Sequence, residues 1–154
     1  MDPTSMPIGA KFAVIHRAFR REIDALLREK DLTGVQFGAL KAVERLEQEG
    51  GEVSQHDVEA LTHSSHPTMT EVLKKLEKKG FIAVRPSETD RRRKQIHSTD
   101  RARELDLSMS RADEKTFAKF SAGLDEGQRN RFEEMLDVLL RSACGECEKE
   151  GSDT

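Results

Sequence analysis

The fold of this chain is decided by the stretch Gly80-Phe81-Ile82-Ala83-Val84-Arg85-Pro86-Ser87-Glu88-Thr89-Asp90-Arg91-Arg92-Arg93-Lys94-Gln95-Ile96-His97-Ser98-Thr99. Two short runs of β-forming residues, Phe81 to Val84 and Gln95 to Ser98, flank a polar turn. Runs of this kind joined by a loop predict a β-hairpin. The turn carries an aspartate followed by four cations: Asp90, Arg91, Arg92, Arg93 and Lys94. We therefore predict a hairpin with a basic tip.

Two short helices are predicted immediately before the hairpin, from Ser54 to Lys79. Ser54 is a good N-cap for a helix through Leu61, and residues 62–66 form a polar turn. Ser65 is predicted to cap the next helix, with Pro67 in the first turn, where a missing N–H costs nothing. Its buried side is supplied by Met69, Val72, Leu73 and Leu76. Gly80 ends that helix.

Longer helices are predicted on both sides of this segment. The first, over about 8–31, has an apolar stripe at helical spacing: Ile8, Phe12, Ile15, Phe19, Ile23 and Leu26. Thr33 and Gln36 form a capping box for a second helix, which Gly50-Gly51 ends. After the hairpin, Thr99 is predicted to cap a helix over about 100–122, and another covers about 126–143. The tail, 145–154, is acidic and poor in apolar residues, so we predict disorder there.

The bulk composition fits a single domain with many exposed helix faces. Of the 154 residues, 35% are hydrophobic and 36% are charged. The net charge is −3, but Thr62 to Arg103 holds eleven Lys or Arg against five Asp or Glu. That segment therefore carries +6 and the remainder −9. Local charge decides whether phosphate is attracted, so the acidic total does not exclude nucleic-acid binding.

No feature of the sequence indicates secretion or membrane insertion. The N-terminal residues lack the pattern of a signal peptide, and no apolar run reaches the length of a membrane span. The two cysteines, Cys144 and Cys147, cannot staple distant parts of a fold. We expect a cytoplasmic protein without cofactor or metal.

The two helices from Ser54 to Lys79 are typical of a helix-turn-helix. In that motif the second helix lies in the major groove of DNA, and its N-terminal side chains meet base edges. The candidate DNA-binding residues there are Ser65, His66, Thr68, Thr70 and Lys74. Two antiparallel core helices joined by a polar turn would give the same pattern, so the motif alone leaves both interpretations open.

The hairpin favours DNA binding, because a strand pair directly after the second helix gives a winged arrangement. Arginines at a wing tip suit the negative potential of a narrow minor groove. The candidate contacts there are Asp90, Arg91, Arg92, Arg93 and Lys94. We expect Asp90 to hold the Arg92 guanidinium through a bidentate pair, which makes Arg92 the principal contact.

Several motifs, taken in order, resemble the MarR family of bacterial transcription regulators. They are Leu32-Thr33…Gln36-Phe37, Ser54-Gln55, His66-Pro67-Thr68-Met69-Thr70, Leu76-Glu77-Lys78-Lys79-Gly80-Phe81-Ile82 and Asp90-Arg91-Arg92. The resemblance covers roughly Ile8 to Ala143. Where the family usually has Leu-Thr and a later Gly after the wing, this chain has Ser98, Thr99 and Ala102, and His63 stands where Gly is common.

The resemblance implies a mainly α fold: a winged helix-turn-helix lobe over about 32–99, with a small β-hairpin wing, and dimerisation helices over about 8–31 and 100–143. It implies a homodimer that binds a pseudo-palindromic double-stranded DNA operator. It also implies a repressor released by a small aromatic or acidic effector, for which no motif assigns pocket residues. The wing aspartate and second arginine of the family fall on Asp90 and Arg92.

The apolar stripes near both ends of the chain independently favour a dimer, since neither end has an obvious core of its own. The alternative is an ordinary intrachain core.

The sequence also leaves other functions open. Cys144 and Cys147 form a Cys-x-x-Cys pair that could act as a redox switch or half of a metal site. The wing could also bind an acidic protein rather than DNA. An enzyme is not expected, since a phosphate loop, a nucleophile–base pair and a βαβ context are all missing from the sequence.

Overall fold

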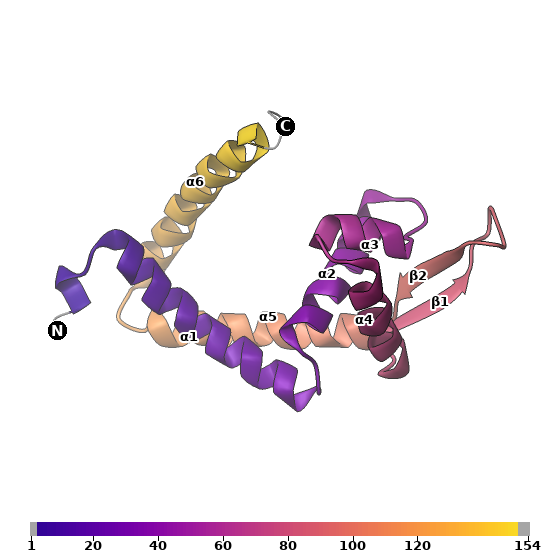
Figure 1. Ribbon diagram of the computed structural model, residues 1–154. Coiled ribbons are helices and arrows are strands. Elements are labelled where there is room, and N and C mark those ends of the chain that lie inside the picture. Colours follow the sequence, from indigo (N-terminus) through magenta and orange to yellow (C-terminus); the bar gives the residue numbers. More distant parts are fainter. Residues whose placement is uncertain (1–2, 151–154) are drawn as a thin grey trace. The chain divides into compact units, whose positions relative to one another are not determined.

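The computed structural model, shown in Figure 1, describes the backbone of residues 3–150 and the side chains of residues 3–143. The chain divides into two compact units, one up to Glu114 and one from Lys115 onward. The elements in order are a 3-10 helix (Pro3–Ser5), α1 (Ile8–Glu29), α2 (Gly34–Glu49), α3 (Gln55–Thr62), α4 (His66–Lys78), β1 (Ile82–Pro86), β2 (Lys94–Ser98), α5 (Asp100–Phe120) and α6 (Glu126–Glu150). This mainly helical fold with one antiparallel hairpin confirms the predicted fold class.

The predicted helix starts at Thr33 and Ser54 are confirmed by their hydrogen bonds. The Thr33 hydroxyl accepts from the Gln36 amide, and the Gln36 side chain accepts from the Thr33 amide, both at 3.2 Å. Ser54 and Asp57 form the same reciprocal box at the start of α3. Each cap satisfies backbone donors that the first turn would otherwise leave unpaired, a gain of about 1 kcal/mol.

Thr99 stands at the N-cap position of α5 but uses its side chain differently from the prediction. Its carbonyl accepts from the Arg103 amide at 3.2 Å. Its hydroxyl donates to the carbonyl oxygens of Gly80 and Phe81, at 2.7 and 3.1 Å. The side chain therefore fastens the start of the hairpin to its end instead of capping the helix.

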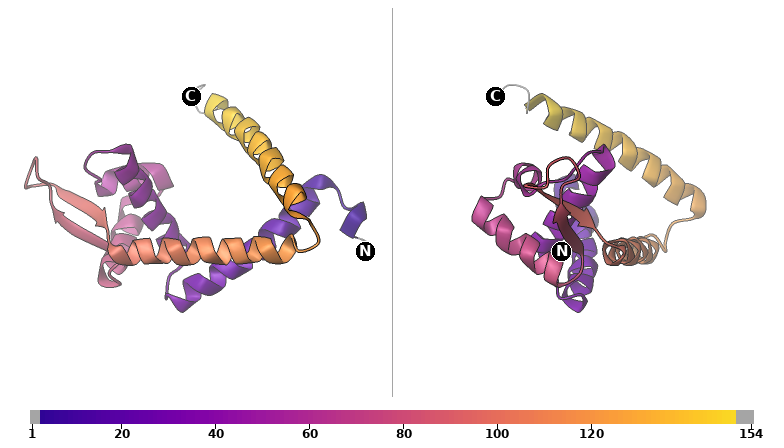
Figure 2. Two further views of the ribbon diagram at one scale, coloured as in Figure 1. Left: turned by 180° about the vertical axis from the view of Figure 1, so that it is seen from behind. Right: turned by 90° about the vertical axis from the view of Figure 1, so that its right-hand side faces the viewer.

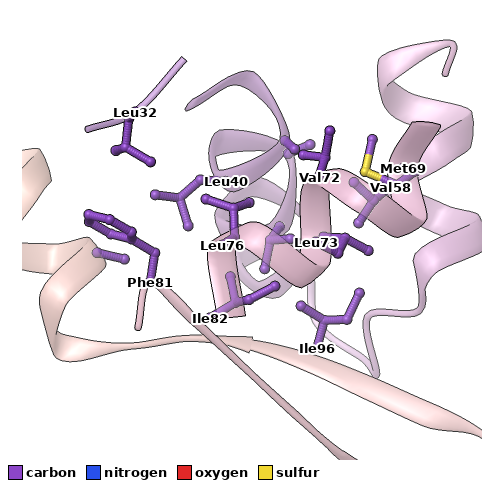
Figure 3. Close-up of a cluster of buried hydrophobic side chains, with 14 of the residues drawn as sticks. Leu32, Leu40, Val58, Met69, Val72, Leu73, Leu76, Phe81, Ile82 and Ile96 are labelled. Carbon is purple, nitrogen blue, oxygen red and sulfur yellow. The ribbon is translucent and has the colours of Figure 1, made fainter. Parts of the chain in front are cut away.

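The hairpin pairs Ile82 with Ser98 at its base and Pro86 with Lys94 at its outer end. The left view in Figure 2 shows it extending away from the helices of its own unit. Its base is held by the core, where Phe81, Ile82 and Ile96 are at most 2% exposed. Figure 3 shows these side chains packed beside Leu73 and Leu76 of α4. The hairpin and α4 therefore share one core, which fixes the wing relative to that helix.

Helix α5 is attached to the same lobe through a charged contact. The Lys41 ammonium on α2 lies 2.6 Å from a Glu44 carboxylate oxygen and 2.8 Å from one of Asp106 on α5. Burial raises the pKa of the Glu44 carboxyl, which is 8% exposed. Ala102 and Leu105 complete this attachment by entering the core.

The unit from Lys115 onward contains the end of α5 and all of α6. The Phe117 and Phe132 rings stack with centroids 6.1 Å apart. Asp125 and Gln128 form a capping box at the start of α6, at 2.8 and 2.9 Å. Helix α6 continues past the predicted end at Ala143. The disorder expected for 145–154 stays a prediction, because those side chains and the backbone of 151–154 lie outside the described residues.

Helices α1 and α6 each expose several large apolar side chains. On α1, Ile8, Phe12 and Ile15 are 72%, 46% and 47% exposed. On α6, Met135 and Leu139 are 59% and 54% exposed. Within the described residues, no helix combines the length and apolar character needed to cross a membrane.

The turn between α3 and α4 contains a strained residue. His63 ends α3 in the left-handed conformation, with φ 51° and ψ 39°. A side chain in this region costs roughly 1–2 kcal/mol, which glycine avoids.

We predict that His63→Gly raises the free energy of unfolding by about 0.5–1 kcal/mol, because the strain relief exceeds the extra entropy that glycine loses on folding. Chemical denaturation measures this change. Ala60→Gly, at an exposed position inside α3, is the control and should lower stability by about 1 kcal/mol. Equal destabilisation by both variants would contradict the assigned strain.

Candidate nucleic-acid interface

The N-terminal end of α4 presents a row of polar side chains. Ser65, His66, Thr68 and Lys74 are exposed, and Thr70 is half-buried. Ser65 stands at the N-cap position, and its hydroxyl lies 2.9 Å from that of Thr68. The Ser65 side chain does not bond a backbone N–H. A helix N-terminus with free donors attracts anions such as phosphate.

Side chains of α3 orient this end of α4. The Gln55 amide donates to the Glu59 carboxylate at 2.7 Å and to the Thr70 hydroxyl at 2.8 Å. His66 Nδ1 lies 2.7 Å from the same carboxylate, while its ring is 75% exposed. The hydrogen bond from Gln55, followed by His66, holds the pKa of Glu59 below its ordinary value. At neutral pH an ionised Glu59 therefore holds His66 at the candidate surface, and Gln55 holds Thr70 there.

The wing tip exposes all five of its predicted residues, Asp90 to Lys94. The expected bidentate pair is not formed: Asp90 Oδ1 instead accepts from the backbone amide of Arg92, at 3.0 Å. The Arg93 amide donates to the Asp90 carbonyl at 2.9 Å. Asp90 therefore shapes the turn through the backbone. The Arg92 guanidinium has no ion pair with it among the described residues, so the prediction of side-chain bracing was wrong.

A groove of about 440 Å³ lies between α3, α4 and the hairpin. Its floor is apolar, formed by Leu73, Val84 and Ile96. Lys74 from α4 and Arg93 and Lys94 from the hairpin line it together. The fold thus brings cations from two predicted elements into one groove. It places Arg91 and Arg92 farther out, at the exposed turn.

Four residues that position the candidate DNA-binding elements were not predicted from the sequence. Gln55 and Glu59 contact α4, and Glu47 and Glu52 contact the hairpin. Gln55 and Glu59 are four apart on one helix, a spacing that signals a side-chain contact. Glu47 and Glu52 bond to Ser98 and Ser87, 51 and 35 residues later, as the partner positions show. No local pattern identifies contacts at such separations.

The sequence left open a metal site or a redox switch at Cys144 and Cys147. Among the described side chains, no group of three or more His, Cys, Asp or Glu could hold a metal. The side chains of Cys144 and Cys147 lie outside that set.

The geometry of α3, its turn, α4 and the hairpin defines a winged helix-turn-helix protein. The model of the MarR family matches residues 30–93, which contain the helix-turn-helix and most of the wing. Over this segment the chain is similar to the MarR family, the family whose motifs the sequence resembles.

Solved structures show the same fold over nearly the whole chain. The crystal structure of MarR has a TM-score of 0.66 and 23% identity, and the match covers 97% of this chain and 98% of that chain. A complex of S. aureus MepR with DNA has a TM-score of 0.68 and 23% identity, covering 86% and 96%. A MepR variant bound to an oligodeoxyribonucleotide gives 0.70 and 22%, covering 90% and 99%. At these identities the likeness concerns the fold.

We predict that Arg92→Ala weakens binding to the preferred duplex by about 1–3 kcal/mol and lowers the slope of its salt dependence by about one. The exposed guanidinium is free to reach DNA, and its loss removes one cation from the interface. Fluorescence anisotropy at several salt concentrations measures both quantities.

Arg20→Ala is the charge-matched control, since Arg20 is an exposed residue of α1 paired with Asp24 at 3.2 Å. It should leave both quantities nearly unchanged. Unaltered affinity and slope in Arg92→Ala would remove Arg92 from the interface.

Proposed function

We propose that this chain is a homodimeric transcription regulator that binds a pseudo-palindromic operator in double-stranded DNA, with α4 in the major groove and the hairpin wing beside it. It represses transcription until a small aromatic or acidic effector releases it. The observation that carries the proposal is the shared basic groove, where Lys74 of α4 meets Arg93 and Lys94 of the hairpin. Such a regulator acts in the cytoplasm, where its operator lies.

Charge and shape support DNA as the partner. The segment from Thr62 to Arg103 carries +6 in a chain of net charge −3, and this excess lies on α4, the hairpin and the start of α5. Cations that neutralise phosphates release condensed counterions, which drives binding. An exposed helix N-terminus flanked by a basic hairpin can contact a base edge and the backbone of one duplex together. The MepR structures in complex with DNA show that this fold accommodates DNA.

Operator selection tests the proposal directly. Genomic fragments bound by the protein should share an inverted repeat whose half-sites are about one DNA turn apart. Aromatic acids added during selection should reduce recovery of those fragments. The variant Arg91→Ala/Arg92→Ala/Arg93→Ala is the control. Recovery of no double-stranded fragment above that control would contradict DNA binding.

The exposed apolar stripes support the homodimer. Ile8, Phe12 and Ile15 on α1, and Met135 and Leu139 on α6, leave large apolar areas uncovered in one chain. Burying such area gains about 25 cal/mol per Å². A second copy of the chain supplies the matching apolar surface, and a two-fold axis places two α4 helices on one face of the DNA.

We predict that the protein sediments at twice its chain mass of 17.4 kDa. Phe12→Glu/Leu139→Glu should shift it to the monomer, because two buried charges per chain would cost several kcal/mol. Analytical ultracentrifugation at micromolar concentration measures the change. Val35→Glu is the control, since Val35 is 60% exposed on α2, and it should stay dimeric. A stable wild-type monomer would exclude the two-half-site model.

A further inference from the structure

The loop of the wing, residues 87–93, is fastened to the lobe by one carboxylate. Glu52 lies in the connection between α2 and α3. Its Oε1 accepts from the backbone amides of Glu88 and Thr89, at 3.0 and 3.3 Å. Its Oε2 accepts from the hydroxyls of Ser87 and Thr89, at 2.5 and 3.1 Å. Within the described residues, the hydrogen bonds that join this loop to another part of the chain all end on Glu52.

Ser87 links Glu52 to the arginine turn, residues 90–93. It is 3% exposed, and its hydroxyl oxygen accepts from the amides of Thr89 and Asp90, at 3.2 and 3.1 Å. Asp90 in turn accepts from the Arg92 amide. A chain of hydrogen bonds therefore leads from the Glu52 carboxylate to the backbone that carries the arginines.

The rest of the hairpin is held elsewhere, at its base. Glu47 of α2 accepts from the amide and hydroxyl of Ser98, at 3.0 and 2.5 Å. The Ile96 amide donates to the Val53 carbonyl at 2.8 Å. The strand pairing stops at Pro86 and Lys94. Beyond that point the hairpin adds one more hydrogen bond, from the Ser87 amide to the Arg93 carbonyl at 2.9 Å. The hydrogen bonds that hold the loop against the lobe are those of Glu52.

We propose that Glu52 is the positioning residue of the wing: without touching DNA, it holds loop 87–93 so that the arginine turn and α4 reach one duplex together. This inference rests on the proposed DNA-binding function. It assigns a role in DNA affinity to an acidic residue whose charge, taken alone, repels DNA.

The carboxylate form is the one that this geometry requires. Four donors converge on its two oxygens, and a glutamine amide offers only one oxygen as acceptor. Its NH₂ group would face the Ser87 hydroxyl, which already accepts two bonds. The hydrogen bonds from Ser87 and then Thr89 hold the pKa of Glu52 below its ordinary value. A lowered pKa in the folded state means that the attachment is complete above the ordinary carboxyl pKa and is lost only as pH falls through the lower one.

Neutralising Glu52 changes DNA affinity in opposite directions under two explanations, a positioning role and a simple effect of its negative charge. Removing a negative charge near a DNA-binding surface strengthens binding if only the field matters. Loss of the loop attachment weakens it, because the ordering of the loop must then be paid for on binding. Glu49→Gln removes the same charge at the end of α2, where Glu49 is exposed and paired with Arg45 at 3.2 Å.

The test compares the affinities of full-length Glu52→Gln and Glu49→Gln for the selected operator. We expect Glu52→Gln to bind about tenfold more weakly than the wild type, and Glu49→Gln to stay within about twofold. Thermal unfolding establishes that both variants are folded. Binding by Glu52→Gln that equals or exceeds that of Glu49→Gln would overturn the proposal.

A double-mutant cycle measures the coupling between Glu52 and the wing arginines in DNA affinity. A general loss of stability would not produce such coupling. In the Arg91→Ala/Arg92→Ala/Arg93→Ala background, Glu52→Gln should cost little further affinity, because the cations that it positions are gone. The same cost in both backgrounds would overturn the proposal.

Hydrogen exchange of the free protein tests the attachment without DNA. The amides of Glu88 and Thr89 should exchange at least about tenfold faster in Glu52→Gln, and unchanged protection would overturn the proposal. If the wild type binds no double-stranded DNA, the proposed function fails, while the exchange rates still report on the attachment.

Discussion

The shared core beneath α4 and the hairpin is the constraint on which the rest of this structure depends. Phe81, Ile82 and Ile96 are buried against Leu73 and Leu76, so the wing cannot move at its base without exposing apolar surface. Full burial of one such side chain is worth about 1.5–3 kcal/mol. The core therefore sets where the base of the wing lies relative to α4, and Glu52 sets the direction of the loop beyond it.

Polar contacts extend this constraint to the surfaces that would meet DNA. Glu59 fixes His66 from α3, and Glu52 fixes the wing loop from the connection before α3. Both carboxylates have a lowered pKa because hydrogen-bond donors surround them. The proposed DNA-binding surface thus contains ionised acids, whose contribution is to place neighbouring groups. Cations such as Lys74 and Arg93, which line the groove, supply the attraction.

Sequence reasoning predicted the parts of this arrangement that depend on local signals. The caps at Thr33 and Ser54, the stop at Gly80 and the hairpin all follow from short patterns of residues, and all are present. The candidate DNA-binding residues lie on α4 and the hairpin, the elements that these patterns predict. The pairing of Asp90 with the Arg92 side chain was wrong, because backbone amides in a tight turn compete for the same carboxylate. Glu47 and Glu52 were missed because their partners are distant in sequence.

The central claim is that α4 and the wing form one surface that contacts a single duplex. The most direct test is an NMR titration of the protein with its selected operator, following the backbone amides of Thr68 and Arg92. Both signals should shift at the same ratio of DNA to protein, because the shared core holds the two elements together. A shift of Thr68 with no change at Arg92 at saturation, or the reverse, would contradict the claim.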